Sequence, residues 1–443
     1  MRTHRFRAGL RVAAAVLLAG AASACGDFLT VENPGAIEEP SLADSTYIPL
    51  MVNGVIGEFQ PTLPVMTYYS SVFTDELRNH HVFFEERLID QRRIGPENAT
   101  FVAFVYNPLH RARFMADSVA GRLRVLLADS AQRDNRLARV LAYGGYTYVL
   151  LAEQLCESPV NLSRPYTSQE LLTQFALPRF DEAIAVATAA RAKPGATAAQ
   201  IATADSLINL ARVGAARASL WLGDKPKAIA YATPVPTAFE FRAYFSENST
   251  RENNPIWNRM SSGTSGNNSG SITNTPFEAL AGDPRVPRPA AMERVMDATN
   301  AFIPNSPSAY STYTGTAVGG DFSKAGWMRI ASGLEARYVE AEAKGPTAES
   351  ITFVESRRAI FTTGTVETTA GNFYANLRDQ RRRDFFMDGH RLGDLRRYIT
   401  QYGVNEFPTG GYPGSSTGET FGDQVCLPLS LAEINGNPNV PRP

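Results

Sequence analysis

Two short motifs in this sequence have residue types and spacings that could carry chemistry. The string from Gly414 to Gly418 matches Gly-x-Ser-x-Gly, the turn that presents a nucleophilic serine in hydrolases. That turn needs a strand before it and a helix after it, whereas the surrounding Gly, Pro, Ser and Thr residues are typical of a loop. His80 and His81 form the second motif. Adjacent side chains do not easily face one metal ion, and no matching Cys, His or Asp pattern follows. The sequence therefore predicts no catalytic residue, no metal and no cofactor.

Acidic pairs such as Glu85–Glu86 and Asp388/Asp394 could in principle act as an acid and a base. With 44 acidic residues in 443, such pairs are expected by chance, and nothing separates these from salt-bridge partners. The sequence also lacks the metalloprotease, P-loop and dinucleotide-binding strings. We therefore expect a protein that is not an enzyme.

A third set of residues fits binding better than catalysis. Residues 233–330 are rich in Gly, Ser, Asn and Pro, yet they keep many aromatic side chains. Aromatic faces pack against the apolar faces of sugars or against peptide side chains, and loops often hold binding residues. The alternative is that these rings anchor irregular loops in small cores. On the first interpretation, the candidate ligand-binding residues are Trp257, Tyr310, Tyr313 and Trp327.

The elements that would position these residues are mostly helical. The stretch Ala215–Asp224 followed by Ala228–Ala232 has the helix–turn–helix spacing of a tetratricopeptide repeat, with Gly223 closing the first helix. Weaker copies pair Arg136–Ala152 with Phe180–Ala187 and Gly333–Glu342 with Ser350–Ile360. Because the copies are unevenly spaced, we expect interrupted helix pairs rather than a regular solenoid. The prediction is a mostly α protein, with a tetratricopeptide-like helical spine over about 40–232 and 331–400 and an irregular, loop-rich second lobe over about 233–330.

The N-terminus predicts export. Four arginines precede the apolar run Val12–Ala22, which is too short to span a bilayer and is typical of a cleaved signal peptide. The run ends in Ala22-Ser23-Ala24 before Cys25, and small residues before a cysteine resemble the site where a lipoprotein is cleaved and acylated. Ordinary secretion, with cleavage after an Ala-x-Ala sequence, is the alternative. We expect residues 1–24 to be the signal peptide and Cys25 to carry the lipid.

The net charge of the chain bears on its possible partners, and its cysteine content bears on a possible disulfide. Removing residues 1–24 takes away four arginines and no acid, which changes the formal net charge from −1 to −5. A net acidic chain argues against nucleic acid as the partner. Cys156 and Cys426 would then be the two remaining cysteines, and they either form one disulfide or are two buried thiols.

Residues 380–398 hold the most regular pattern of the chain. Read as one helix, they place Phe385, Gly389, Leu392 and Leu395 on a single stripe, and Gly389 indicates a close approach to another element. Opposite charges three residues apart could pair on the helix surface. The predicted pairs are Arg381–Asp384, Asp388–Arg391, Arg391–Asp394 and Asp394–Arg397.

The same stretch, Arg-Arg-Arg-Asp-Phe-Phe-Met-Asp-Gly-His-Arg-Leu-Gly-Asp-Leu-Arg-Arg, resembles the signature helix of the SusD/RagB-like nutrient-binding outer-membrane lipoproteins. Phe28-Leu29 after Cys25 resembles the start of the mature proteins of that family, and Leu427–Asn439 resembles their terminal string. The motifs occur in the family's order and span the mature chain, 25–443, as a single SusD-like domain.

The resemblance implies a surface lipoprotein of the cell outer membrane, lipid-anchored and facing outward. Such a protein captures a glycan or another oligomeric nutrient and hands it to a SusC-like TonB-dependent transporter. It further implies that Asp75, Glu76, Asn79 and His81 wall the ligand site, a solvated charged face being the alternative for each. Residues 380–398 are then structural. Two rival interpretations remain: an exported helical-repeat scaffold lipoprotein, and a glycan-degrading enzyme on a helical frame.

Overall fold

The computed structural model describes residues 39–79, 83–260, 270–272, 274–280, 282–286, 293–296, 302–306, 320–413, 415 and 417–441. The chain divides into two units, one ending at Ile48 and the other beginning at Pro49. The described part of the first unit consists mainly of two short 3-10 helices, η1 (Glu39–Ala43) and η2 (Ser45–Tyr47). Asp44 caps η2, because its carboxylate accepts a hydrogen bond from the backbone N–H of Thr46.

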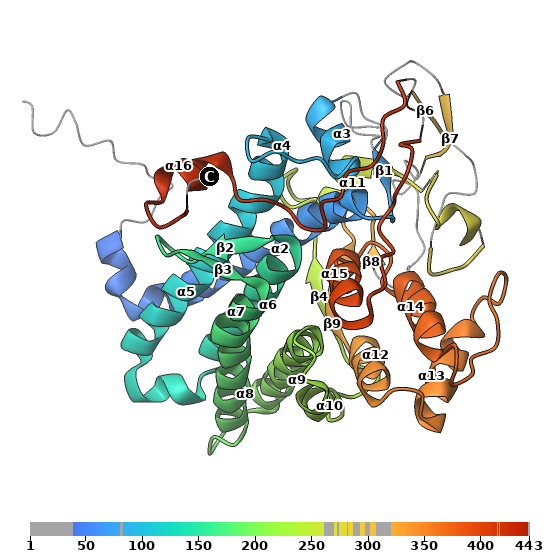
Figure 1. The fold of residues 1–443 in the computed structure, drawn as a ribbon. Coiled ribbons are helices and arrows are strands. Elements are labelled where there is room, and N and C mark those ends of the chain that lie inside the picture. Colours follow the sequence, from blue (N-terminus) through green and yellow to red (C-terminus); the bar gives the residue numbers. More distant parts are fainter. Residues whose placement is uncertain are drawn as a thin grey trace, which may run out of the picture. The chain divides into compact units, whose positions relative to one another are not determined.

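Helices dominate the second unit (Figure 1). The longer ones are α2 (Ile48–Phe73), α5 (Asn107–Leu127), α6 (Asn135–Gln154), α8 (Leu177–Arg191), α9 (Ala198–Trp221), α10 (Lys225–Ala232), α12 (Gly333–Lys344), α13 (Ala348–Arg358), α14 (Phe373–Asp384) and α15 (Arg391–Tyr402). The shorter ones are α3 (Phe84–Asp90), α4 (Ala99–Phe101), η3 (Val102–Tyr106), η4 (Ala128–Arg133), α7 (Ser168–Glu170), η5 (Leu171–Ala176), α11 (Pro255–Met260), η6 (Glu278–Leu280) and α16 (Leu431–Gly436).

The strands are short and form small antiparallel sheets. They are β1 (Arg78–Asn79), β2 (Glu157–Pro159), β3 (Pro165–Thr167), β4 (Glu240–Tyr244), β5 (Gly270–Ser271), β6 (Glu293–Met296), β7 (Phe302–Ser306), β8 (Gly320–Asp321) and β9 (Trp327–Ser332). The pairings are β1 with β5, β2 with β3 and β6 with β7, and β9 lies between β4 and β8. The mostly α fold class is confirmed.

The helix pairs of the spine form where the sequence predicts them. Helix α9 begins at a capping box on Thr197 and ends before Gly223, whose φ of +76° closes the helix with no Cβ penalty. Asp224 then caps α10, which packs back against α9. Helices α6 and α8 contact each other in the same way, and so do α12 and α13. The interrupted tetratricopeptide-like spine is therefore confirmed.

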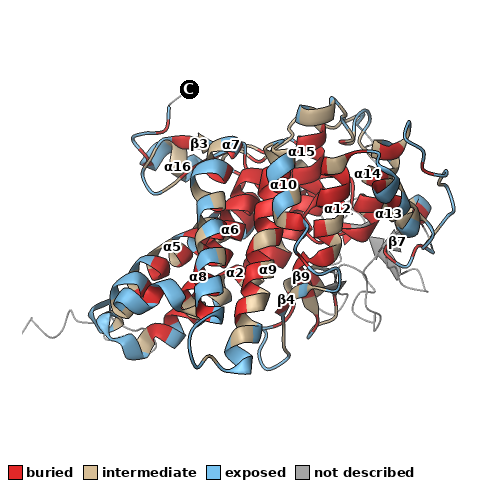
Figure 2. Cartoon of the chain, turned by 90° about the horizontal axis from the view of Figure 1, so that it is seen from below, coloured by how far each residue is buried: buried red, intermediate tan, exposed pale blue. Residues whose placement is uncertain are grey.

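The tightest packing in the spine surrounds Phe180 of α8. A Cβ added to Gly145 of α6 would lie 2.5 Å from this ring, and one added to Gly214 of α9 would lie 2.3 Å from it. Both positions need glycine because the ring occupies the space of a side chain. Buried residues concentrate along the central helices α6, α9, α12, α14 and α15 (Figure 2).

Residues 380–398 are not one helix, and that prediction is wrong. Helix α14 ends at Asp384, and Met387 and Gly389 take φ values of +53° and +86° before α15 starts. Such φ values cannot continue a right-handed helix. The predicted close approach at Gly389 is confirmed, since a Cβ there would lie 2.9 Å from Thr67 Oγ1 of α2.

The charges of this stretch are buried and pair differently from the surface prediction. Of the four predicted pairs, the structure has Asp394–Arg397, at 3.1 Å. The break between the helices turns the other side chains toward different elements. Arg381 bonds to Asp394 at 2.7 Å across the break, and Asp388 bonds to Arg329 of β9 at 2.6 Å. These ion pairs join the C-terminal helices to the rest of the core.

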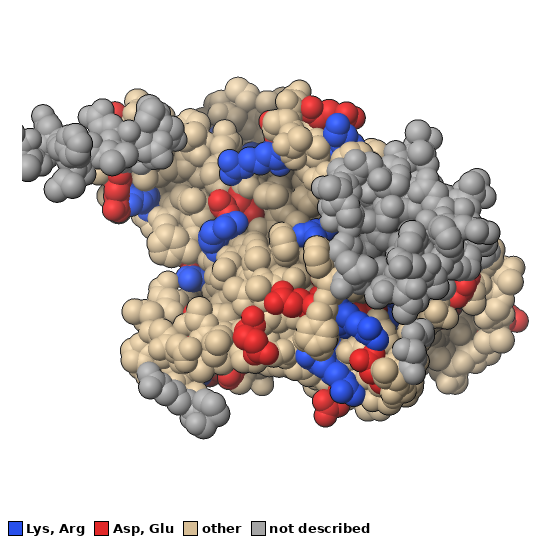
Figure 3. Space-filling model, turned by 90° about the horizontal axis from the view of Figure 1, so that it is seen from above, with Lys and Arg blue, Asp and Glu red and all other residues tan. Residues whose placement is uncertain are grey.

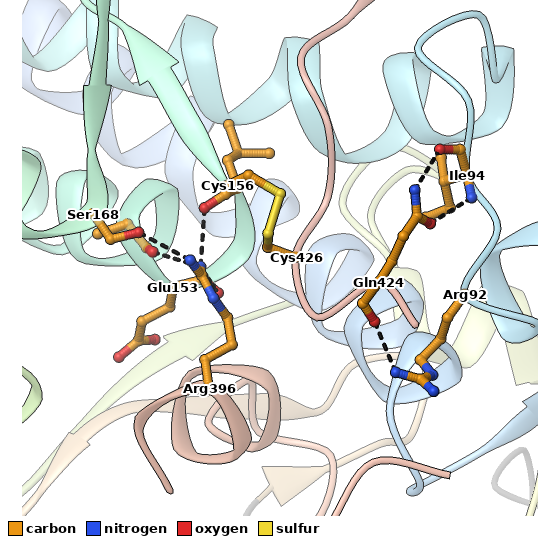
Figure 4. Close-up of a disulfide and its surroundings, with 10 residues drawn as sticks. Arg92, Ile94, Glu153, Cys156, Ser168, Arg396, Gln424 and Cys426 are labelled. Atoms are coloured by element: carbon orange, nitrogen blue, oxygen red, sulfur yellow. Dashed lines mark hydrogen bonds between the residues drawn. A yellow bond between two sulfur atoms is a disulfide. The ribbon is translucent and has the colours of Figure 1, made fainter. Parts of the chain in front are cut away.

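Cys156 and Cys426 form a disulfide with Cα atoms 5.0 Å apart, one of the two alternatives that the sequence leaves open. Figure 4 shows this disulfide linking the end of α6 to the C-terminal segment. Two backbone hydrogen bonds reinforce it: Cys156 N–H donates to Leu427 O, and Leu427 N–H donates to Gln154 O, each at 2.9 Å. The C-terminal segment is thereby tied to the spine.

Candidate functional site

Several residues that the sequence nominates lie outside the described part of the chain: His81, Tyr310, Tyr313 and the lipidation candidate Cys25. Much of the predicted second lobe, 233–330, also lies outside it. These assignments stay predictions.

Asp75 and Glu76 belong to the buried core, where their carboxylates bond to other parts of the chain, and their predicted place in the wall of the ligand site stays a prediction. Asp75 accepts two hydrogen bonds from Arg391, both at 2.7 Å. Burial works against its charge, but the guanidinium outweighs that effect and lowers the pKa of Asp75. Glu76 accepts from Ser71 Oγ at 2.7 Å and from the Met387 N–H at 2.8 Å. Both carboxyl groups join the end of α2 to the break between α14 and α15.

Asn79 is also buried, on the two-residue strand β1. Its backbone N–H donates to Asp90 of α3 at 2.7 Å, and Arg78 pairs with the same carboxylate at 2.8 Å. The local role of this strand is thus to connect α2 to α3. A ligand contact by the Asn79 side chain stays a prediction.

The two described tryptophan candidates are half-buried, and each lies beneath a cation. The Lys324 Nζ is 5.4 Å from the Trp257 ring centre on α11. The Arg242 guanidinium carbon is 3.6 Å from the Trp327 ring centre on β9. Tyr244 lies directly opposite Trp327 across the β4–β9 pair and is 64% exposed. Both tryptophans are therefore partly exposed, and each has a cationic hydrogen-bond donor over its ring.

A further aromatic cluster joins three elements that are far apart in the sequence. Tyr69 of α2 and Phe104 of η3 are stacked, with ring centres 5.7 Å apart and planes 21° apart. Arg259 of α11 lies over both rings, its guanidinium carbon 4.2 Å from the centre of Phe104 and 5.3 Å from that of Tyr69. Phe104 is 37% exposed, so the stack reaches the surface. We call Tyr69, Phe104 and Arg259 the aromatic cluster.

Glu86 of α3 fixes the polar side of this cluster. Its Oε1 accepts a hydrogen bond from the Tyr69 hydroxyl at 3.1 Å and lies 3.5 Å from Arg259 Nη1. Burial is the largest effect on Tyr69 and raises its pKa, so the hydroxyl stays a donor at physiological pH. The ring planes and the guanidinium are therefore held in place before any ligand arrives.

Two more rings begin the helix that carries Glu86. Phe83 and Phe84 are 59% and 70% exposed, the latter being the highest exposure of any described aromatic side chain. The side of the molecule where α3, α4 and α11 lie in Figure 1 faces the reader in Figure 3. There the charged side chains of described residues are scattered and not gathered by sign. Phe83 and Phe84 thus add exposed rings at the start of α3, the helix that places Glu86 against the aromatic cluster.

The sequence did not reveal the aromatic cluster. Tyr69, Phe104 and Arg259 are not among the ligand-binding residues that the sequence predicts. The only local signals of Phe104 and Arg259 were an aromatic run, Phe101–Tyr106, and an arginine two residues after Trp257. The stacking depends on contacts between residues about 35 and 190 positions apart, which spacing along the chain does not encode.

A second polar assembly is fully buried and surrounds His390. The imidazole Nδ1 lies 2.6 Å from Asp388 and the Nε2 lies 2.9 Å from Glu335. Burial and Arg217 act to lower the pKa of His390, but the two carboxylates outweigh them and raise it. Arg217 in turn bonds to Glu153 of α6 at 2.5 Å. With no opening to solvent, this assembly holds α6, α9, α12 and α15 together and is not a ligand site.

Neither a metal centre nor a membrane span emerges from the described residues. Within them, no group of three or more His, Cys, Asp or Glu side chains is arranged to hold a metal ion. No described helix combines the length and the apolar character needed to cross a bilayer.

No protein-family model and no curated protein matches this sequence, but solved structures match its fold. A laminarin-binding SusD-like protein is 14% identical, with 88% of this chain and 98% of that chain covered at a TM-score of 0.60. A SusD superfamily protein from Bacteroides fragilis is 12% identical, with 89% and 98% covered at 0.61. Surface glycan-binding protein A from Bacteroides thetaiotaomicron, solved with laminarihexaose, is 13% identical, with 81% and 91% covered at 0.59.

These matches span nearly the whole length of each similar protein, so the likeness concerns the complete fold and not one helix pair. The chain has the SusD-like fold, and the SusD/RagB-like resemblance that its motifs carry is supported at the level of structure.

Proposed function

We propose that this protein is a nutrient-binding protein that captures a glycan on the aromatic cluster. The observation that carries the proposal is the stack of the partly exposed Phe104 on the buried Tyr69, under the Arg259 guanidinium and within a SusD-like fold. Two proteins with this fold bind laminarin or laminarihexaose, according to their descriptions. The C–H faces of a pyranose pack on aromatic rings, while its hydroxyl groups accept from arginine and donate to carboxylates.

Capture on this surface requires no bond cleavage, and we propose that the protein is not an enzyme. The ligand would be held between exposed rings and released intact to the next component of the uptake system. We propose Phe83 and Phe84 as additional contacts, because both side chains are exposed and lie at the start of α3, the helix that carries Glu86.

Affinity electrophoresis against a panel of soluble polysaccharides, beginning with laminarin, tests the proposal. The expected result is retardation by at least one polysaccharide with no release of reducing ends on long incubation. Release of reducing ends would support the glycan-degrading alternative. No retardation by any member of the panel would favour a scaffold lipoprotein.

The proposal extends to the place and partner of capture. We propose that Cys25 is acylated after removal of residues 1–24, which tethers the protein to the outer membrane facing outward. The captured glycan then passes to a SusC-like TonB-dependent transporter on which the protein sits.

A pull-down from native membranes with a C-terminal tag tests the partner directly. A stoichiometric outer-membrane barrel in the eluate would support hand-over to a transporter. The Cys25→Ser variant should leave the membrane fraction while still binding polysaccharide. If wild-type and variant proteins fractionate alike, Cys25 is not the anchor.

A further inference from the structure

A cavity of about 650 Å3 lies at the end of α3, and no residue of the aromatic cluster lines it. One side is formed by Arg92 and Arg93, which follow α3, and the other by the C-terminal segment between 405 and 424. In Figure 1 this red segment passes close to α3. The lining residues are Arg92, Arg93, Asn405, Thr409, Gly410, Phe421, Gly422, Asp423 and Gln424.

Arg92 differs from every other buried arginine in the described part of the chain. Nine buried arginines each have a carboxylate oxygen within 4.0 Å: Arg78, Arg113, Arg217, Arg285, Arg329, Arg381, Arg383, Arg391 and Arg397. Arg92 is only 2% exposed, yet among the described residues it forms no ion pair. The charge of Asp423, an exposed residue of the same lining, acts on Arg92 without forming an ion pair. An exposed carboxylate compensates a buried cation only in part, so an anion in the cavity would stabilise Arg92 further.

The hydrogen bonds of Arg92 hold its position without neutralising its charge. Its Nη1 donates to Gln424 O at 2.8 Å, and its Nη2 donates to Pro408 O at 2.6 Å and also to Gly422 O. Figure 4 shows the bond to Gln424, whose side chain in turn bonds to the Ile94 backbone. Burial lowers the pKa of Arg92 to about 10, which leaves the guanidinium charged at neutral pH. All three acceptors are neutral carbonyl groups.

The backbone at Arg92 is also one that favours glycine. Arg92 N–H donates to Ile89 O and Arg93 N–H to Leu88 O, which is the Schellman pattern that ends a helix. The residue in the left-handed position of that pattern is Arg92, with φ of +55°. A non-glycine residue there is strained, and such strain is often kept where the side chain has a function.

The rim of the cavity supplies hydrogen-bond donors and a single carboxylate. Arg93 is exposed, and its one described side-chain bond goes to Thr420 Oγ1 at 2.9 Å. The amide oxygen of Asn405 accepts from the Phe407 N–H at 3.0 Å, which leaves its NH2 group to donate. Asp423 is the one acidic residue in the lining, and it is exposed. The described lining therefore holds two arginine side chains and one carboxylate, so its net charge is positive.

We propose that this cavity binds an oxyanion, either a carboxylate or a sulfate group carried on a saccharide. The oxyanion rests on the charge of Arg92, which forms no ion pair with a described residue, and on the donors of Arg93 and Asn405. That a saccharide carries it rests on the proposed function. Arg93 and Asn405 contact the anion directly, and Arg92 attracts it from behind through its charge.

Isothermal titration of the purified protein with glucuronate, with inorganic sulfate and with neutral glucose, all at one ionic strength, tests this site. Glucuronate or sulfate should saturate the wild-type protein, and glucose should not. The Arg93→Gln variant should weaken that binding about tenfold, because it removes a charge-assisted hydrogen bond. Asp423→Asn should strengthen it, since the opposing carboxylate is lost. Arg191→Gln, at an exposed arginine on α8, is the matched control and should change nothing.

The opposite directions of Arg93→Gln and Asp423→Asn separate ligand binding from a structural effect, which would weaken both. Saturation by glucuronate alone identifies a carboxylate site, and saturation by sulfate alone a sulfate site. If neither anion saturates the wild-type protein, or if both variants bind like it, the proposal is wrong. Neutral laminarihexaose, titrated in parallel, reports on the aromatic cluster, so failure of this site is distinguishable from failure of the proposed function.

Discussion

At the scale of single residues, the buried carboxyl group of Glu76 makes the stability of this protein depend on pH. Burial raises its pKa from 4.5 to about 8, although Ser71 and the Met387 N–H both favour the ionised form. Between these values the folded protein holds a proton that the unfolded chain has released. Stability from this group is therefore complete below about 4.5 and is lost as the pH rises through about 8.

The expected slope is a loss of about 1.4 kcal/mol of unfolding free energy per pH unit between about pH 5 and 8 from Glu76 alone. His390, whose pKa is also raised, adds loss in the same direction above its unfolded pKa of 6.5. Urea unfolding of the wild type and of Glu76→Gln at several pH values checks this. The variant should show a flatter dependence. Parallel curves for the two proteins would contradict the assignment to Glu76.

Asp388 gives a second prediction at this scale. Its removal in Asp388→Ala leaves Arg329 and His390 buried without their shared counter-charge, which should cost about 3–5 kcal/mol of unfolding free energy. Asp205→Ala, which removes the partner of the exposed Arg191, is the matched control and should cost less than about 1 kcal/mol. Similar losses for the two variants, measured by urea unfolding, would show that the His390 assembly is not a stabilising centre.

At the scale of elements, close packing of α6, α8 and α9 depends on two glycines against Phe180. Gly214→Ala should destabilise the protein by about 1–3 kcal/mol, because the added methyl group would overlap the ring. Gly121→Ala on the exposed side of α5 meets no atom within 4 Å and should instead stabilise by up to about 1 kcal/mol. Thermal unfolding of both variants tests the pair. Equal stabilisation by both would mean that Phe180 has room to move.

The sequence predicts some of these helices but not all of the helix ends. The pairs α6/α8, α9/α10 and α12/α13 follow from helical periodicity and from small residues at the contacts, which are local properties. The break between α14 and α15 does not. Phe385, Gly389, Leu392 and Leu395 keep helical spacing through it, although Gly389 has a φ of +86°. The contact that leaves no room for a Cβ at Gly389 comes from Thr67 of α2, more than 300 positions earlier.

The candidate site was less predictable than the fold, for a related reason. Asp75 and Glu76 have the residue types of a binding pocket. Their carboxyl groups instead accept hydrogen bonds from Arg391 and from the Met387 N–H, which lie more than 300 positions away in the sequence. Phe104 and Arg259 become a site only because η3 and α11 meet over Tyr69. Burial and partners at long sequence separation decide these roles, and neither can be read from composition.

At the scale of the whole molecule, the disulfide closes a loop of 270 positions and holds the C-terminal segment against α6. The double variant Cys156→Ser/Cys426→Ser should lose about 2–4 kcal/mol of unfolding free energy. Amide exchange should accelerate at Leu427, whose N–H bonds to Gln154 O, and should change little in the centre of α9. Unchanged protection at Leu427 would mean that the segment is held without the covalent link.

Glycan capture is the function proposed for the whole molecule, and oligosaccharide titration of variants in the aromatic cluster tests it. The ligand is the oligosaccharide of whichever polysaccharide retards the protein, with laminarihexaose as the first choice. Phe104→Ala should weaken binding about tenfold or more, because burying an aromatic ring contributes about 1.5–3 kcal/mol. Phe114→Ala, which removes a ring of α5 that is 59% exposed, is the matched control. Normal affinity is expected for the control and lost affinity for Phe104→Ala, with both variants folded. Equal affinity for wild type, Phe104→Ala and Phe114→Ala would show that the aromatic cluster does not bind the glycan.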